Sequence, residues 1–139
     1  MPVLARWMIK AALAYLVTAL ILGLLVAAGP QLGLPSSIGV FQPVYLHLLM
    51  VGWVTQLIFG VVYWMFPKYS REHPRGSERL GWAIFWMLNA GLILRVIGEP
   101  LAVLVPGALA GWLLAASALL QFGAGWAFVA NTWGRVKER

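Results

Sequence analysis

The chain has 139 residues, of which 62% are hydrophobic and 10% are charged, and its formal net charge at pH 7 is +6. Soluble domains carry about 25% charged residues, and so short a chain has too little interior to bury this much apolar side chain. The composition excludes soluble enzymes and soluble nucleic-acid-binding modules, and it indicates a membrane protein. The sequence contains no cysteine, which excludes disulfides, thiolate catalysis, zinc–thiolate sites and iron–sulfur clusters.

Four apolar stretches are long enough to cross a hydrocarbon core, which takes about 20 helical residues. They predict an all-α integral membrane fold, a bundle of four transmembrane helices that forms one domain over residues 1–139. The predicted spans are Ala11 to Ala28, Val44 to Phe66, Leu80 to Ile97 and Gly107 to Trp133. The first stretch also fits a cleaved signal peptide, but its length and the three spans after it favour a retained helix.

The distribution of basic residues predicts the orientation of the bundle. Nine of the ten Lys and Arg residues lie before the first span, in the second loop or after the fourth span, and residues 29–43 and 98–106 contain none. Because Lys and Arg are in excess on the cytoplasmic side, both termini are predicted to be cytoplasmic, in the cell (inner) membrane. The nine residues are Arg6, Lys10, Lys68, Arg71, Arg75, Arg79, Arg135, Lys137 and Arg139.

Ionisable side chains within the spans are expected near the outer face. At about 1.5 Å per residue, His47 and Glu99 lie about 29 Å and Arg95 about 22 Å above the cytoplasmic ends of their helices. Arg95 and Glu99 are four residues apart, so they share a helix face and can pair. A membrane arginine is a functional candidate by default, and pairing with Glu99 or snorkelling to the interface is the structural alternative. His73, in the basic loop, is expected to be a solvated residue.

At middle depth the spans carry three amides, Gln56, Asn89 and Gln121, which are expected to form hydrogen bonds between helices. The fourth span carries a ladder of small residues, Gly107, Gly111 and Ala115, that permits close helix packing within or between protomers. The prolines near span ends, Pro67, Pro74 and Pro100, are expected at or beyond the ends of helices.

The sequence around His47 resembles a known haem-binding helix. The run from His47 to Lys68 reads HLLMVGWVTQLIFGVVYWMFPK. It resembles the second helix of the catalytic subunit of haem-copper oxidases, particularly of the cbb3-type oxidase and nitric oxide reductase branch. In that family a helix of the H-L-x-x-x-G-W type, ending in Tyr, an aromatic residue and Pro, supplies an axial histidine to the low-spin haem. The segment from Leu88 to Pro100 looks like the following helix in short relatives.

The resemblance implies a non-covalent haem b, because the chain has no C-x-x-C-H motif for covalent attachment. It implies that His47 is the metal ligand and that Arg95 neutralises the haem propionates. The family's reaction centre needs several further histidines, whereas the chain has two in all. Reduction of oxygen or nitric oxide by the family mechanism is therefore not expected, and no catalytic residue is predicted.

The second axial ligand cannot come from the helix of His47, because one helix reaches only one face of the porphyrin. A homodimer that shares one haem between two copies of His47 is the favoured arrangement, and a trimer with one haem per protomer is the second. Electron transfer to an unspecified redox partner is the favoured function. The alternatives are a haem-free accessory or assembly subunit of a respiratory complex and a five-coordinate haem protein that binds or senses a gas. No feature of the spans is typical of a transporter or channel.

Overall fold

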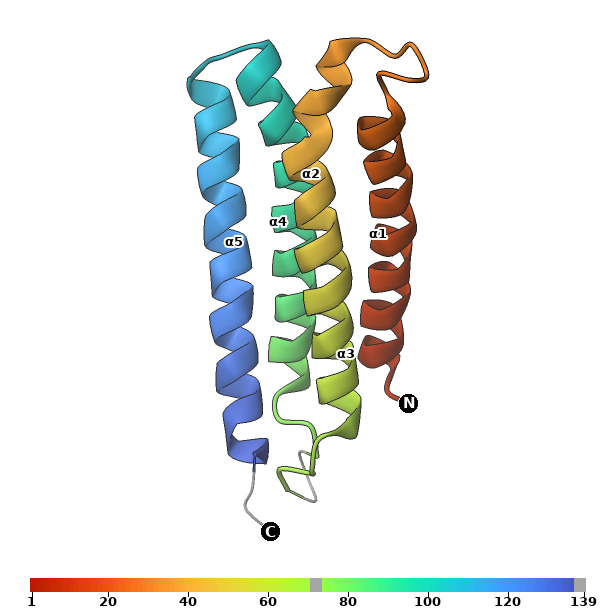
Figure 1. The fold of residues 1–139 in the computed structure, drawn as a ribbon. Helices are drawn as coiled ribbons and strands as arrows, with labels where there is room; N and C mark the ends of the chain where they lie inside the picture. Colours follow the sequence, from red (N-terminus) through yellow and green to blue (C-terminus); the bar gives the residue numbers. More distant parts are fainter. Residues whose placement is uncertain (71–73, 137–139) are drawn as a thin grey trace.

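The computed structural model describes residues 1–70 and 74–136, and it is all-helical (Figure 1). Its four long helical segments are α1 (Val3–Ala28), a second span (Ser36–Met65), α4 (Glu78–Leu104) and α5 (Ala108–Thr132), which the short η3 (Trp133–Arg135) extends. All four are long and apolar enough to cross a membrane, as predicted. The first residues of α1 and the last residues of α5 lie at the same end of the bundle, the lower end in Figure 1.

The second span is not a continuous α-helix. It consists of the 3-10 helix η1 (Ser36–Phe41), α2 (Gln42–His47), the π-helix η2 (Leu48–Thr55) and α3 (Gln56–Met65). A π turn takes more residues than an α turn, so η2 rotates the residues above it relative to their positions in a regular α-helix. The apolar run of this span carries no periodic pattern that would indicate such a turn, and the sequence predicted a plain helix.

The core joins all four spans only in the lower half of the bundle. α1 packs mainly on the second span, and α4 packs mainly on α5. The rings of Phe59 and Phe128 stack with their centroids 3.7 Å apart and connect the two pairs. The buried apolar residues of this lower core are Leu4, Ala5, Met8, Phe59, Tyr63, Ile84, Phe85, Leu88 and Ala124. A smaller cluster in the upper half, Ala19, Val44 and Leu48, joins only α1 to the second span.

Glycines of α4 allow α4 and α5 to approach each other closely. A Cβ atom at Gly91 would lie 2.9 Å from the Gln121 side chain, and one at Gly98 would lie 3.0 Å from Leu114. The predicted small-residue ladder of α5 does not serve this contact, since a Cβ atom at Gly111 would meet no atom of the described residues within 4 Å. Within this chain, the close approach of α4 and α5 therefore depends on the glycines of α4.

Pro100 lies inside α4, which corrects the prediction that the third span ends at Ile97. The helix continues to Leu104, and the connection to α5 shortens to residues 105–107. Helical hydrogen bonding resumes after the proline, because the Val105 amide donates to the Leu101 carbonyl at 2.9 Å. Membrane helices tolerate an internal proline when their surroundings satisfy the freed backbone group. Pro67 and Pro74 do lie beyond helix ends, as predicted.

Of the three mid-depth amides, only Asn89 forms the predicted hydrogen bond between helices in the described chain, because the amide of Gln121 bonds within α5. The Tyr15 hydroxyl of α1 donates to Asn89 Oδ1 of α4 at 2.8 Å. Gln121 Nε2 donates to Ser117 Oγ at 2.9 Å, and that hydroxyl donates to the Gly91 carbonyl of α4 at 2.7 Å. Gln56 differs, because it is fully buried and neither polar atom of its amide has a hydrogen-bond partner among the described residues.

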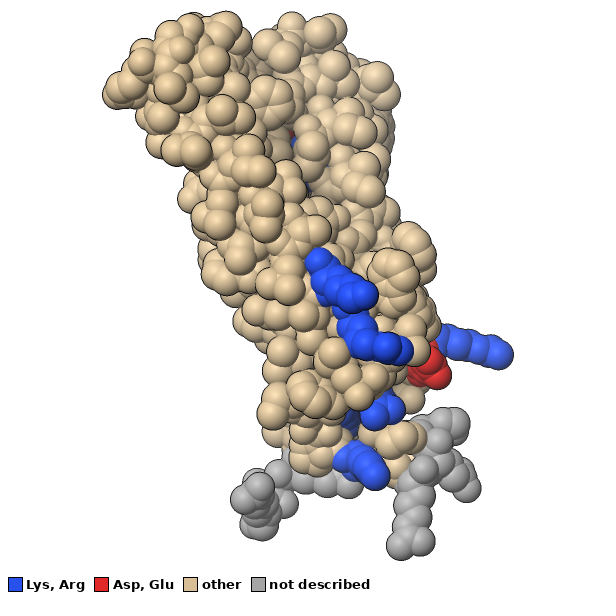
Figure 2. Space-filling view, turned by 90° about the vertical axis from the view of Figure 1, so that its right-hand side faces the viewer, with Lys and Arg blue, Asp and Glu red and all other residues tan. Residues whose placement is uncertain are grey.

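The surface is apolar along the spans and basic at the lower end. Figure 2 shows Lys and Arg side chains gathered over the lower half of one face, below a mostly uncharged surface in which charged atoms are visible only inside a crevice. Large apolar side chains that are 64% to 75% exposed include Leu24, Trp112, Leu119 and Trp126. This distribution suits a bundle surrounded by lipid. Four residues of the sequence-based predictions lie outside the described residues: Arg71, His73, Lys137 and Arg139.

Arg135 is buried, although the sequence placed it among the basic residues of the cytoplasmic face. The residue as a whole is 1% exposed. Its Nη2 donates to the carbonyls of Tyr63 at 3.2 Å and Phe66 at 2.8 Å, and its Nε donates to that of Pro67 at 3.0 Å. These carbonyls belong to the C-terminal end of α3 and the residues after it, where backbone acceptors lack intrahelical donors. Arg135 therefore ties the end of α5 to the end of the second span.

We predict that Arg135→Met lowers the free energy of unfolding by about 2 kcal/mol, because it removes charge-assisted hydrogen bonds to buried carbonyls. Reversible unfolding of the detergent-solubilised protein measures the change. Arg79→Met is the matched control, since Arg79 is exposed at the same end of the bundle and its loss should leave stability nearly unchanged. Equal effects of the two substitutions would contradict the capping role.

Candidate functional site

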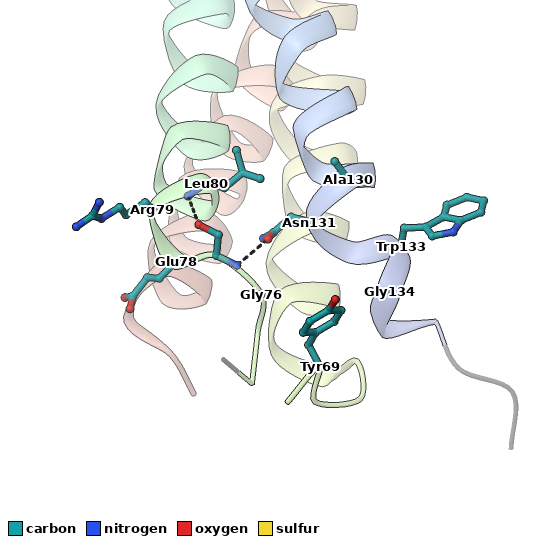
Figure 3. A pocket seen from close by; sticks show the side chains of 10 residues that line it. Tyr69, Gly76, Glu78, Arg79, Leu80, Ala130, Asn131, Trp133 and Gly134 are labelled. Carbon is teal, nitrogen blue, oxygen red and sulfur yellow. Dashed lines mark hydrogen bonds between the residues drawn. The ribbon is translucent and has the colours of Figure 1, made fainter. Parts of the chain in front are cut away.

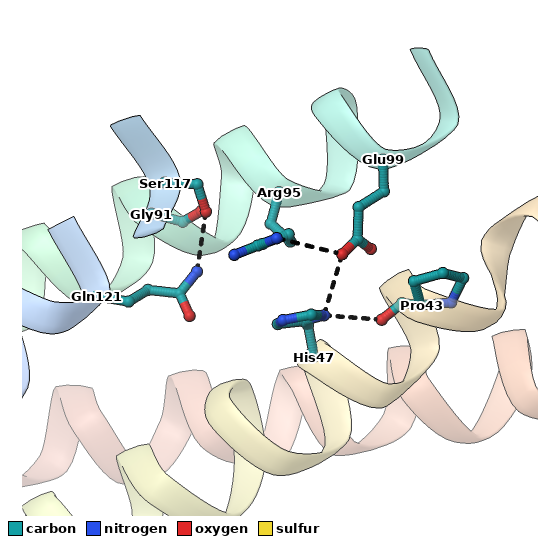
Figure 4. A network of polar contacts seen from close by, with 7 residues as sticks. All are labelled: Pro43, His47, Gly91, Arg95, Glu99, Ser117 and Gln121. Carbon is teal, nitrogen blue, oxygen red and sulfur yellow. Dashed lines mark hydrogen bonds and ion pairs between the residues drawn. The ribbon is translucent and has the colours of Figure 1, made fainter. Parts of the chain in front are cut away.

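His47, Arg95 and Glu99 meet in the upper half of the bundle, between the second span and α4 (Figure 4). Glu99 Oε1 lies 3.2 Å from His47 Nδ1 and 3.6 Å from Arg95 Nη1. The structure thus contains the predicted pair of Arg95 and Glu99. It also shows a contact between Glu99 and His47 that the sequence did not predict, since residues on different helices share no spacing rule. One carboxylate therefore connects both candidate site residues.

The contacts of His47 distinguish its two ring nitrogens. Nδ1 lies 3.0 Å from the carbonyl oxygen of Pro43, besides its contact with Glu99 Oε1. A carbonyl oxygen and a carboxylate are both acceptors, so these contacts favour the tautomer that carries its hydrogen on Nδ1. Nε2 has no hydrogen-bond partner in the part of the chain that the structure describes, and it lies on the far side of the ring in Figure 4. In the neutral ring the lone pair of Nε2 is available to a metal ion.

The packing of α2 turns His47 toward α4. Val44 and Leu48 are 1% and 3% exposed, and they pack with Ala19 of α1. Because these two residues anchor one face of the helix to α1, His47 lies on another face. The π-helix η2 begins directly after His47, so this side chain is rotated relative to the position that a regular α-helix would give it.

The three side chains are mostly shielded, and their polar atoms are only partly paired. The exposed fractions are 9% for Glu99, 20% for Arg95 and 32% for His47. Arg95 Nε and Glu99 Oε2 are buried without a hydrogen-bond partner among the described residues. A membrane interior offers such atoms no other partner. The network is therefore balanced in charge between Arg95 and Glu99, and it retains one donor and one acceptor for a further polar group.

α5 places polar side chains beside this network. Gly91 and Arg95 are one turn apart on α4, and the side chain of Gln121 packs against Gly91. Figure 4 shows Gln121 and Ser117 beside the face of α4 that carries Arg95. The sequence predicted an interhelical bond for Gln121, whereas its amide bonds to Ser117 of the same helix. The sequence did not connect Gln121 to the site, because its depth alone does not show which face of α5 meets α4.

A separate cavity of about 890 Å³ lies at the lower end of the bundle (Figure 3). Among its lining residues, Asn131 Oδ1 accepts from the Ser77 amide at 2.9 Å, and Ser77 Oγ accepts from the Leu80 amide at 3.2 Å. These bonds cap the start of α4. The charged side chains of Glu78 and Arg79 point away from this pair in Figure 3. The cavity therefore has the features of a helix cap and not those of a reaction site.

The described part of the chain contains no cluster of side chains that could bind a metal ion without a cofactor. No three His, Asp or Glu side chains there are placed to hold a metal ion together. A single accessible imidazole suits a metal whose other ligands come from a macrocycle. His47 is therefore a candidate for an axial ligand and not for a member of a protein-only metal centre.

Comparison of the chain with protein-family models, curated proteins and solved structures finds no match. The resemblance to haem-copper oxidases remains a prediction that rests on the residues around His47.

We predict that Glu99→Gln lowers the free energy of unfolding by roughly 1 to 3 kcal/mol, because it leaves the Arg95 charge unpaired inside the bundle. The amide oxygen of the new side chain can still accept from His47, so the loss reports mainly on Arg95. Combining the change with Arg95→Met should recover most of the stability, which a double-mutant cycle of melting in detergent measures. Strictly additive effects of the two changes would show that the pair is not coupled.

Proposed function

We propose that this protein is an integral membrane haem b protein that transfers electrons, with His47 as an axial ligand of the iron. The observation that carries the proposal is the set of contacts of His47, whose Nδ1 lies 3.0 Å from the Pro43 carbonyl oxygen and 3.2 Å from Glu99 Oε1 and whose Nε2 has no partner among the described residues. Metal-bound histidines typically donate their other ring N–H to a carbonyl or carboxylate, which orients the ring and makes the ligand more basic.

The residues around His47 fit a haem by their chemistry. The unpartnered Arg95 Nε is a donor for a carboxylate, and the haem carries two propionates. Glu99 holds both the imidazole and the guanidinium, so it positions the iron ligand and the propionate-binding group relative to each other. Haem b would supply reversible one-electron chemistry to this site.

The proposed orientation places the basic end of the bundle and both termini in the cytoplasm, within the cell membrane. The charge distribution supports it, because the described Lys and Arg residues other than Arg95 lie toward the end of the bundle where α1 begins and α5 ends, and cytoplasmic segments are rich in these residues. The site of His47 then lies near the opposite, outer face.

We propose that a homodimer binds the haem, with His47 of each copy on one face of the porphyrin. The partial exposure of the His47 side chain, 32%, supports access from outside the single chain. A trimer in which each copy holds its own haem is the second arrangement. It leaves an open coordination position and corresponds to a gas-binding or sensor protein.

A haem-free accessory or assembly subunit is the second candidate function. The observation that favours it is that Glu99 already pairs with both His47 and Arg95, so these three residues can stabilise the bundle without any ligand. Reduction of oxygen or nitric oxide by the family mechanism is not proposed, because the two histidines of the sequence are too few for that reaction centre.

We predict that the purified protein shows the Soret band of a bound haem and that His47→Ala abolishes it, because the substitution removes the iron ligand without adding polarity to the span. Absorption spectra of the oxidised and reduced protein measure this. His73→Ala is the control and should leave the spectrum unchanged. A colourless protein that takes up no added haem would favour the accessory subunit, and full haem content in His47→Ala would exclude His47 as the ligand.

We predict opposite shifts of the reduction potential for changes of the two charged residues. Arg95→Leu removes a positive charge near the iron, which disfavours the added electron and lowers the potential. Glu99→Gln removes a negative charge and raises it. Redox titration of the haem-loaded variants measures both shifts. Unmoved potentials in both variants would leave Arg95 with a structural role only.

A further inference from the structure

Gln56 is the one mid-depth amide whose polar atoms find no partner in the described chain. Its residue is 0% exposed, and both Nε2 and Oε1 lack a hydrogen bond to the described residues. Asn89 and Gln121, at similar depth, are each held by a side-chain hydroxyl. The difference indicates that Gln56 has another kind of partner, because a buried amide without hydrogen bonds is strongly unfavourable.

The neighbours of Gln56 place its side chain on the seam between α1 and the second span. Gly52 and Gly60 lie one turn above and one turn below it. A Cβ atom at Gly52 would meet the Tyr15 ring at 2.8 Å, and one at Gly60 would meet the Met8 side chain at 3.0 Å. In this antiparallel register Gln56 lies level with Ala12, which is fully buried. The residue opposite the amide is therefore a small one.

The backbone at Gln56 departs from α-helical hydrogen bonding. The π-helix η2 ends at Thr55, and the Gln56 amide donates to the carbonyls of Val51 and Trp53 in place of the carbonyl four residues back. Irregular turns of this kind occur where a water or a side chain enters the hydrogen-bond ladder of a helix, and often at functional sites. The polar side chain and the irregular backbone thus coincide at one level of the bundle.

We propose that Gln56 anchors an internal water-binding site in the middle of the membrane, between α1 and the second span. Ordered water is the usual partner of buried polar groups that the protein itself does not satisfy, and the amide offers it both a donor and an acceptor. The Tyr15 hydroxyl donates to Asn89 and keeps lone pairs for a further donor on the same seam. This site is independent of haem binding and of the proposed function.

Transfer of magnetisation from water to glutamine side-chain amides tests the proposal directly. The chain has four glutamines, so selective ¹⁵N labelling of the protein in nanodiscs gives a simple spectrum that Gln56→Leu and Gln121→Leu assign. The Gln56 amide should receive magnetisation from water. The Gln121 amide, which donates to Ser117, is the internal reference and should receive much less. Absence of transfer to Gln56 would overturn the proposal.

A steric variant tests the location of the water. Ala12→Val adds two methyl groups opposite Gln56 and should abolish the transfer to its amide, while the Gln121 signal stays in place as a report of the fold. Ala19→Val is the matched control, because Ala19 is equally buried on α1 but packs against the apolar Val44 and Leu48. Transfer that persists in Ala12→Val, or that is lost equally in both variants, would overturn the assignment of the water to this seam.

Discussion

The four spans are long and apolar enough to cross a membrane, and the structure suits the constraint that this environment would impose, which is that hydrocarbon cannot hydrogen-bond to a protein. Every polar group within the spans must find its partner inside the bundle. The Tyr15–Asn89 bond joins α1 to α4, and the Ser117–Gly91 bond joins α4 to α5. Where these bonds form, the helices are held in a defined rotation, which apolar side chains alone specify poorly in lipid.

Glu99 is the clearest result of this constraint. A carboxylate inside a membrane requires positive or donating partners, and Glu99 has one on its own helix, Arg95, and one on the second span, His47. The same contacts of Glu99 therefore stabilise the fold and form the proposed site. Holding the second span against α4 also orients the imidazole, so the chemistry of His47 follows from the way the bundle is assembled.

The two halves of the bundle differ in how completely they are packed. The lower half contains the core to which all four spans contribute, and Arg135 ties two helix ends together there. The upper half has a smaller apolar cluster that reaches only α1 and the second span, together with the partly paired network around Glu99. Stability is concentrated where the packing is complete. Two unsatisfied polar atoms that a ligand can use, Arg95 Nε and Glu99 Oε2, lie in the upper half.

The sequence alone determined the number of apolar spans, the depth of their polar residues and the pairing of Arg95 with Glu99, because these follow from composition, helical rise and spacing within one helix. It also drew attention to His47 through the residues around it. Only the tertiary structure decided which helix faces meet. Contacts between residues distant in sequence account for three such features: the His47–Glu99 contact, the approach of Gly91 to α5 and the burial of Arg135. The isolation of Gln56 likewise depends on how the helices pack and on the π turn. The continuation of α4 past Pro100 likewise depended on its surroundings, since the rule that proline ends a helix holds in water and is relaxed where neighbouring helices support the chain.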